Sequence, residues 1–314
     1  MLLTLGLIDL SFRAVFPHFS RLPDGFSAAY LARELRSLEG GRPIVVLGDS
    51  VLWGYGISAE QTAAARLHWK NLAYEGGSPA NIYAMALLLL AQGIHPRAVV
   101  FNVNLKTFNP LDSAYARLHP SAARLVTPLL SAGDRTLLSL DAAGSFESRL
   151  NDLVERYWLL YAMRNDVRST LFGAPDAAHA LDALRAVLSG ASERKRQAHR
   201  LRPDRFEGTY ALGTLDSSNV SLHFLIEAVA LLRRARIPCA AVFTPTNHAL
   251  LHEYIDVPEY GAQLTALRRA LGPRGARILD YDREFTASEF IDNDHLTPAG
   301  NSHLARLLRS VAIP

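Results

Sequence analysis

Short apolar runs alternate with longer segments of helical periodicity along most of this chain. Apolar runs of four or five residues are typical of strands that are buried on both faces of a parallel sheet. The predicted strands are 43–47, 98–101, 240–243 and 277–281, with a short strand or turn at 71–74. The predicted helices are 60–70, 78–92, 222–236, 260–271 and 298–308. Strands separated by helices predict parallel βαβ units, and hence an α/β fold built as a three-layer α/β/α sandwich.

Residues 109–215 break this alternation, because they are helical and loop-like with only sparse prolines and glycines. We interpret them as a mostly helical insertion on the loop side of the sheet, where it would shape a substrate site. The predicted organisation is an N-terminal apolar segment with a lead-in helix at 1–42, followed by one domain at 43–314 that carries the insertion.

The N-terminus is apolar over residues 1–8, but Asp9 and Arg13 interrupt it. This is well short of the roughly 20 apolar residues that a membrane span needs. It also lacks the basic segment and small-residue cleavage site of a signal peptide. Two interpretations stay open: the remnant of a longer membrane anchor, or an amphipathic first helix packed on the domain.

Composition narrows the function classes. The chain has 314 residues, 49% hydrophobic and 20% charged, with a net charge of +3. Such a small excess gives no case for nucleic-acid binding. The densest basic run, 194–205, is interpreted as a solvated face, with an anionic-ligand or membrane-surface patch as the alternative. The single cysteine, Cys239, excludes an intrachain disulfide and a cysteine-based metal site, and it lies in an apolar run typical of a buried thiol.

Two short motifs near the ends of the chain carry the chemistry. Gly48, Asp49 and Ser50 follow the first predicted strand, and Asp292 precedes His295 by three positions. A serine hydroxyl attacks carbonyl groups when a base removes its proton, and the base works best when a third group orients it. The sequence therefore predicts a Ser/His/Asp acyl-transfer site. Taken alone, Gly-Asp-Ser is equally compatible with a strand-to-helix turn in which Asp49 or Ser50 caps the helix.

Two further segments strengthen the prediction. Gly76 lies in a turn after the second predicted strand, and Asn104 follows the third. Ligands of open parallel sheets bind beyond the carboxyl ends of the strands, so these residues are expected to converge with Ser50. A backbone amide and a side-chain amide are suitable donors for a developing oxyanion. The structural alternatives are a turn glycine and a loop-capping asparagine.

These four blocks resemble the SGNH (GDSL-type) hydrolase superfamily, which is named after its Ser, Gly, Asn and His. The resemblance rests on Val-Leu-Gly-Asp-Ser at Ser50, Asn-Leu-Ala-Tyr-Glu-Gly at Gly76, Phe-Asn-Val-Asn at Asn104, and Asp-Asn-Asp-His at His295. It implies a flavodoxin-like parallel sheet, Ser50 as nucleophile, His295 as base and Asp292 as the group that orients His295. It also implies an oxyanion hole from the Ser50 and Gly76 amides and Asn104, and no cofactor.

The chain departs from the family pattern at two blocks. Asn102 and Leu105 stand where the family's third block usually has glycine and aspartate, and Ala73 stands where the second block often has glycine. Gly77 and Asn102 are therefore rival candidates for the two oxyanion-hole positions.

Asp292 competes with Asp294 for the role of orienting His295. A residue three positions away can share a face with the imidazole. We expect Asp294, which is adjacent, to point elsewhere in a tight turn. The other histidines lack metal-ligand spacing, so no metal site is predicted.

Four further residues are candidates for the substrate pocket. Trp53 and Tyr55 follow the nucleophile and would form an apolar or sugar-stacking wall, with core packing as the alternative. Asn247 and His248 follow the predicted strand 240–243, again at a carboxyl end. They are candidates to line the pocket, and the alternative is that they are ordinary loop residues.

The surroundings of Ser50, the insertion and the segment 243–247 are similar to SGNH-like proteins of bacterial glycopolymer modification. That group includes alginate O-acetylation proteins and the D-alanyl-lipoteichoic-acid protein family. The similarity implies transfer or removal of an O-acyl group, with acetyl favoured, on an exported polysaccharide. It also implies a periplasmic location, with an N-terminal anchor compatible and the cytoplasm still open, and a membrane-bound O-acyltransferase partner. The alternatives are a general carboxylesterase or lipase-like hydrolase of small or lipid esters, and a non-catalytic scaffold.

Overall fold

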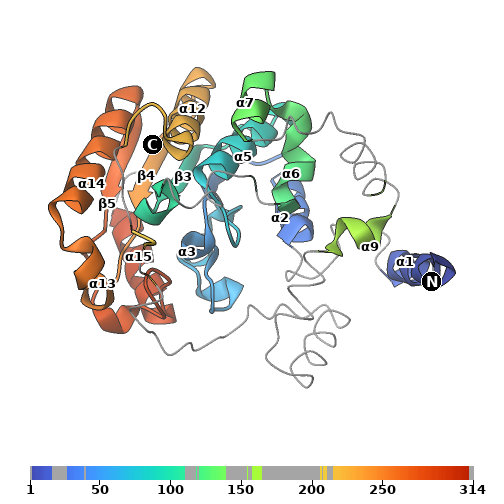
Figure 1. Cartoon of the computed structure of the whole chain (residues 1–314), viewed down its shortest axis with the longest axis horizontal. Coiled ribbons are helices and arrows are strands. Elements are labelled where there is room, and N and C mark those ends of the chain that lie inside the picture. The colour runs from blue at the N-terminus through green and yellow to red at the C-terminus, as the bar shows by residue number, and fades with distance from the viewer. Residues whose placement is uncertain are drawn as a thin grey trace. The chain divides into compact units, whose positions relative to one another are not determined.

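A computed structural model defines the fold of most of the chain (Figure 1). The residues that it describes are 2–15, 27–38, 40–109, 118, 120–138, 154, 158–164, 206, 208–210 and 215–310. The basic run 194–205 and much of the predicted insertion 109–215 lie outside these residues.

The chain divides into two compact units. One combines residues 1–37 with 120–194, and the other combines 38–119 with 195–314. The helices of the first unit are α1 (Leu2–Val15), α2 (Ser27–Arg36), α6 (Pro120–Val126), α7 (Ala132–Leu137) and α9 (Leu159–Ala162), with the 3₁₀ turn η4 (Thr127–Leu129).

Helix α1 packs against α9 within the first unit. The Asp9 carboxylate accepts hydrogen bonds from the Leu160 amide at 2.7 Å and from Arg13 at 2.7 Å. Leu7 and Leu10 on the same helix are exposed. Within the described residues, we find no helix that has both the length and the apolar character needed to cross a membrane.

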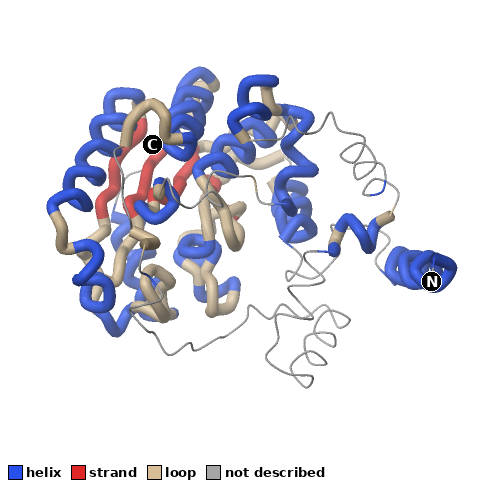
Figure 2. The backbone as a smooth tube through the Cα atoms, viewed as in Figure 1, coloured by secondary structure: helices blue, strands red, loops and turns tan. Residues whose placement is uncertain are grey.

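The second unit is built on a five-stranded parallel sheet in the order β2-β1-β3-β4-β5, flanked by helices (Figure 2). This confirms the predicted α/β class. The strands are β1 (Ile44–Leu47), β2 (Lys70–Asn71), β3 (Ala98–Val103), β4 (Cys239–Phe243) and β5 (Ala276–Asp280). Every residue of β1, β3 and β4 is buried, because these strands have neighbours on both edges and helices over the sheet. In the edge strand β5 only Ala276 and Leu279 are buried.

The longer helices of this unit agree with the periodic pattern of the sequence. They are α5 (Pro79–Ala91), α12 (Val220–Arg234), α14 (Pro258–Leu271) and α15 (Pro298–Ser310). Ser78 caps α5 by accepting a hydrogen bond from the Asn81 amide, and proline at the first helical position needs no donor there. Helices α5 and α12 pack side by side, with the Tyr83 and Phe224 rings 5.6 Å apart.

The prediction of one helix over 60–70 was wrong. This segment forms the 3₁₀ turn η2 (Ala59–Gln61), the short helix α4 (Ala63–Arg66) and the start of β2. Thr62 separates the first two, because its backbone is extended and its side chain accepts from the Ala65 amide as a helix cap. His68 adopts a positive φ of 57°, which ends the helical path before the strand.

Three further elements follow strand ends where the sequence pattern gave no helix. They are α3 (Ser50–Trp53), η3 (Leu105–Phe108) and α13 (His248–Ile255). The remaining 3₁₀ turns are η7 (Gly272–Arg274) and η8 (Ala287–Glu289). Asn247 is the signal that predicts α13 in retrospect, since its side chain accepts from the Leu250 amide as an N-cap.

The strand register brings the segments that carry the candidate site residues to the carboxyl end of the sheet. Leu47 lies opposite Phe101, and Val103 lies opposite Phe243. Because all pairs are parallel, the residues that follow β1, β3 and β4 leave the sheet on the same side. Ser50, Asn104 and Asn247 therefore start from neighbouring positions in the fold, as the sequence pattern predicts.

Gly48 is the tightest point of this end of the sheet. Its φ is +145°, and a Cβ atom placed there would lie 1.8 Å from the Asn102 Oδ1 atom. That oxygen accepts a hydrogen bond from the Asp49 amide at 3.0 Å, so the Gly48–Asp49 backbone packs directly on β3. Glycine is required because any side chain would separate the Ser50 loop from the sheet.

We therefore expect Gly48→Ala to lower the free energy of unfolding by about 1–3 kcal/mol through backbone strain alone, with the overlap adding to it. The matched control is Gly261→Ala on α14, where a Cβ would meet nothing within 4 Å. Alanine in a helix interior should leave stability equal or raise it by up to about 1 kcal/mol. Denaturant unfolding of both variants measures the difference. Equal stability of the two would contradict the close packing at Gly48.

Candidate active site

Ser50 is the first residue of α3, directly after the turn that leaves β1. Asp49 caps this helix, since its Oδ1 atom accepts from the Val51 amide at 2.9 Å. Ser50 is half-buried, whereas Val51 and Leu52 are buried in the core. The cap interpretation of Asp49 and the nucleophile interpretation of Ser50 are thus compatible, because the two residues do different things.

The structure brings Ser50, His295 and Asp292 together in one chain of hydrogen bonds. The distance from Ser50 Oγ to His295 Nε2 is 2.7 Å, and the distance from His295 Nδ1 to Asp292 Oδ2 is 2.6 Å. Asp292 is fixed in turn, because its Oδ1 accepts from the His295 amide at 2.8 Å and the Asp294 amide at 3.1 Å. This is the nucleophile–base–orienting-group geometry that acyl transfer requires.

The direction of proton flow follows from the donors and acceptors. An ionised Asp292 carboxylate can only accept, so His295 Nδ1 carries the hydrogen in the neutral imidazole. Nε2 is then unprotonated and accepts the Ser50 hydroxyl hydrogen. Asp292 therefore selects the tautomer in which His295 can act as a base toward Ser50.

The surroundings of His295 and Asp292 favour the ionised form of each side chain. Burial lowers the pKa of His295, but the Asp294 charge and the Asp292 hydrogen bond and charge outweigh burial and the opposing Lys106 charge, so this pKa is raised. Burial raises the pKa of Asp292, yet the hydrogen bonds from His295 and the Asp294 amide bring the net pKa below its ordinary value. The site is thus built to hold a proton on His295 next to an ionised Asp292.

Asp294 lies closer to His295 than we expected from its adjacent position. Its Oδ1 atom is 3.5 Å from His295 Nδ1, although Asp292 makes the shorter contact. Its Oδ2 atom accepts from Asn104 Nδ2 at 2.6 Å and pairs with the Lys106 ammonium. Asp294 therefore contacts Asn104, directly after β3, and Lys106 on η3, and its other oxygen faces the imidazole.

Asn104 is fixed by both ends of its amide. Its Oδ1 accepts from the Lys106 backbone amide at 3.3 Å, and its Nδ2 donates to Asp294. An amide nitrogen carries two hydrogens, so Asn104 can still donate one to a bound acyl oxygen. The rival Asn102 is as buried as Asn104, but it lies within β3 and its oxygen accepts from the Asp49 amide, whereas Asn104 lies beyond the strand and contacts the loop that carries His295. Asn104 is the better candidate for the oxyanion hole.

The two glycines after β2 have different surroundings. Gly76 is exposed and has a φ of +72°. Gly77 is buried, and its added Cβ would lie 2.2 Å from the Gly48 carbonyl oxygen. Gly77 permits close packing on the Ser50 turn, and its amide donates to the Tyr74 carbonyl at 3.2 Å. Because the Gly77 amide is engaged, Gly76 stays the candidate oxyanion donor.

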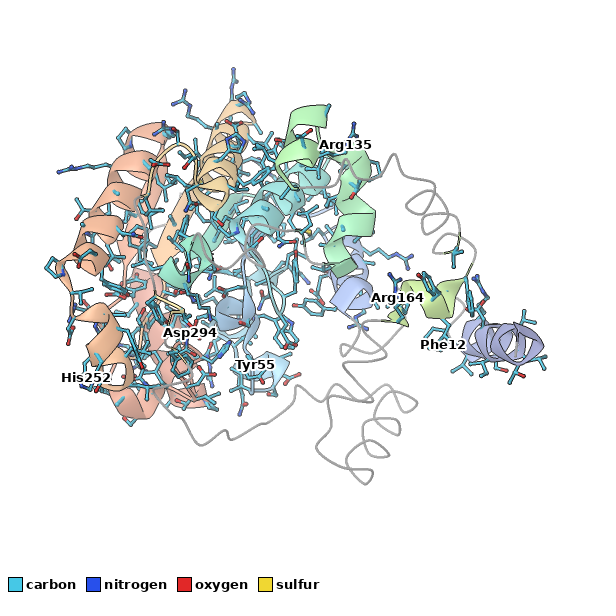
Figure 3. All side chains as sticks on the ribbon, viewed as in Figure 1. Phe12, Tyr55, Arg135, Arg164, His252 and Asp294 are labelled. Atoms are coloured by element: carbon cyan, nitrogen blue, oxygen red, sulfur yellow. The ribbon has the colours of Figure 1, made fainter. Side chains whose placement is uncertain are left out.

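The two aromatic candidates near Ser50 also differ. Tyr55, which Figure 3 labels together with Asp294, is half-buried. Its ring lies beside the His295 imidazole, with centroids 4.6 Å apart and the ring planes at 37°. Trp53 is only 8% exposed. The structure thus favours core packing for Trp53 and leaves Tyr55 as the candidate aromatic wall beside His295.

Asn247 and His248 lie at the carboxyl end of β4 as predicted, but their side chains are engaged with protein groups. Asn247 Nδ2 donates to the Asp292 carbonyl at 2.9 Å, so Asn247 supports the loop that carries the base. His248 Nε2 lies 2.9 Å from Asp282 Oδ2, and Tyr260 donates to the other oxygen of Asp282. His248 thus belongs to a separate cluster.

Asp292, Asp294 and His295 present potential ligand atoms within 4.8 Å of one another. These atoms already serve the triad and the Lys106 pair, so a cation would have to displace these contacts. We assign no metal to this site, and the absence of a metal site stays a prediction.

Sequence reasoning missed Lys106 and the position of Asp294. The available signals were weak: Lys106 follows Asn104 by two positions, and Asp294 is adjacent to His295.

Comparison of the sequence with protein-family models and with curated proteins found no significant match.

Proposed function

We propose that this protein is a serine-dependent esterase or O-acyltransferase that works through an acyl-Ser50 intermediate. The observation that carries the proposal is the continuous hydrogen-bonded chain from Ser50 through His295 to Asp292. The strand order 2-1-3-4-5, which is also that of flavodoxin-like sheets, and the four sequence blocks support assignment to an SGNH-type hydrolase. We also propose, as part of this assignment, that the fold is a three-layer α/β/α sandwich that carries a helical insertion.

The reaction begins with His295 Nε2 taking the Ser50 proton while Ser50 Oγ bonds to the acyl carbonyl carbon. The carbonyl oxygen becomes an oxyanion, to which the Ser50 and Gly76 amides and Asn104 donate. The carbon–oxygen bond to the alcohol then breaks, and the imidazolium gives its proton to the leaving oxygen. Water or a sugar hydroxyl, deprotonated by His295, attacks the acyl carbon of the acyl-serine. The bond to Ser50 Oγ breaks, and the imidazolium returns its proton to Ser50.

For the substrate, we propose an O-acyl group, with acetyl favoured, on an exported bacterial polysaccharide. This part rests on the resemblance of the sequence to glycopolymer-modifying SGNH proteins. The half-buried Tyr55 beside His295 is compatible with an acceptor sugar, because aromatic faces pack on sugar rings. An extracytoplasmic location and a membrane-bound O-acyltransferase partner belong to the same proposal.

An assay with an aryl acetate, with and without an oligosaccharide acceptor, tests the choice of acceptor. Acceptor-dependent acetyl transfer supports the polysaccharide assignment. Fast hydrolysis that is indifferent to glycans supports a general esterase. A non-catalytic scaffold predicts neither, and it is rejected if Ser50→Ala removes an activity from a folded chain.

The pH dependence tests the role of His295. Because the pKa of His295 is raised above its ordinary value of about 6.5, kcat/KM should fall on the acid side with a midpoint above 6.5. The base is active only when neutral, so activity is full above the midpoint and lost below it. Initial rates with an aryl acetate from pH 5 to 9 measure this. A flat profile, or a midpoint below 6.5, contradicts the proposed role.

A further inference from the structure

A buried ion pair lies directly behind the candidate active site. The Asp294 side chain is 1% exposed and pairs with Lys106, whose side chain is 12% exposed. Burying two charges is costly, and a lone partner of such a pair is strongly destabilising. The triad mechanism does not itself require either residue.

The Asp294 carboxylate connects two functional groups that come from distant parts of the chain. One oxygen accepts from the Asn104 amide at 2.6 Å, and the other lies 3.5 Å from His295 Nδ1. The Lys106 backbone amide donates to Asn104 Oδ1, so Lys106 contacts Asn104 through its main chain and Asp294 through its side chain. Lys106, Asn104 and Asp294 thus close a ring of contacts beside the base.

We propose that Asp294 and Lys106 are positioning residues that orient the Asn104 amide and set the charge state of His295 through two opposed charges. The effect on catalysis rests on the proposed function, whereas the effect on the imidazole does not. Because the Asp294 charge acts on the ring more strongly than the Lys106 charge, the pair as a whole favours the imidazolium that forms during the reaction.

Few other groups of the described residues contact or face the His295 imidazole. Asp292 comes from the same loop, Ser50 and the Tyr55 ring come from α3 and the turn after it, and Lys106 comes from η3. Asp49 interacts with both members of the pair, and burial raises its pKa. The charges that act on His295 itself are those of Asp294, Asp292 and Lys106. The net electrostatic effect on the imidazole therefore depends on Asp292, Asp294 and Lys106. The Asp294 charge raises the pKa of His295, and the Lys106 charge lowers it.

Three proteins test the proposal: the wild type, Asp294→Asn, and Asp294→Asn combined with Lys106→Met. NMR titration of the His295 imidazole, assigned by its loss in His295→Gln, gives a midpoint for each without any substrate. Asp294→Asn should lower the midpoint by about one pH unit or more, because the charge that favours the imidazolium is removed while the opposing Lys106 charge remains. Adding Lys106→Met should raise the midpoint again, toward but not to the wild-type value. Asp256→Asn removes an exposed carboxylate beside His248 instead, and it should leave the midpoint unchanged.

The acid limb of kcat/KM should move in the same directions as the NMR midpoints. Stability gives a second readout, because Asp294→Asn buries the Lys106 charge without the Asp294 charge beside it and should unfold more easily than the double variant, which has neither charge. If Asp294→Asn does not fold, the double variant against wild type still decides, with a lower midpoint expected. An unchanged or higher midpoint in Asp294→Asn or in the double variant overturns the proposal. If the NMR midpoints shift as expected but the wild-type protein has no esterase activity, only the proposed function is contradicted.

Discussion

Ser50→Ala is expected to reduce the turnover of an aryl acetate by a factor on the order of 10⁴ to 10⁶. The hydroxyl is the only group of the triad that forms a bond to the acyl carbon, and alanine has no substitute for it. The Asp49 cap and the buried residues Val51 and Leu52 remain, so α3 should keep its place. Steady-state rates at a pH above the acid limb measure the loss.

The matched control for this variant is Ser288→Ala, which removes an exposed hydroxyl near the loop that carries His295. It should keep wild-type rates. Circular dichroism and thermal unfolding of both variants separate loss of chemistry from loss of fold. Substantial turnover by a folded Ser50→Ala protein would mean that another group is the nucleophile.

Asp292→Asn should lower kcat/KM by about 10⁴ with little change in structure. Asparagine still offers an oxygen to the backbone amides of Asp294 and His295. Its NH₂ group would face His295 Nδ1, however, and would require that nitrogen to accept a hydrogen bond. The imidazole hydrogen then moves to Nε2, which can no longer take the proton of Ser50.

Asp292→Asn also tests whether Ser50, His295 and Asp292 act together rather than independently. Combining Asp292→Asn with Ser50→Ala should cost little more than Ser50→Ala alone, because a base without a nucleophile has nothing to activate. Losses that multiply in the double variant would indicate independent roles. A wild-type rate for Asp292→Asn would transfer the orienting role to Asp294, whose Oδ1 is 3.5 Å from the same nitrogen.

The sheet could be predicted from the sequence because β1, β3 and β4 are buried on both faces and become continuous apolar runs. The 60–70 segment could not, since its apolar residues fit a helix while the Thr62 cap and the positive φ of His68 divide it. Helix α13 was not predicted, because its first turn directly follows residues 244–247, whose sequence is typical of a loop after a strand.

The candidate site was predictable where backbone topology decides the geometry. Parallel strands bring the segments after β1 and β3 to one edge, and the spacing of Asp292 and His295 lets both side chains face the same way. Contacts that depend on side-chain conformation were not predictable. Asn104 and Asp294 are 190 positions apart, and no local pattern connects them. The same holds for Asn247, whose side chain contacts the Asp292 carbonyl 45 positions away.

Covalent labelling with a fluorophosphonate probe tests the central claim most directly, because such a probe reacts with a serine whose proton is taken by a neighbouring base. Intact-mass analysis and peptide mapping of the folded protein should find one adduct, located on Ser50. The adduct should be absent from Ser50→Ala and strongly slowed in Asp292→Asn. Folded wild-type protein that stays unlabelled, or that is labelled at a different serine, would contradict the account of Ser50 as an activated nucleophile.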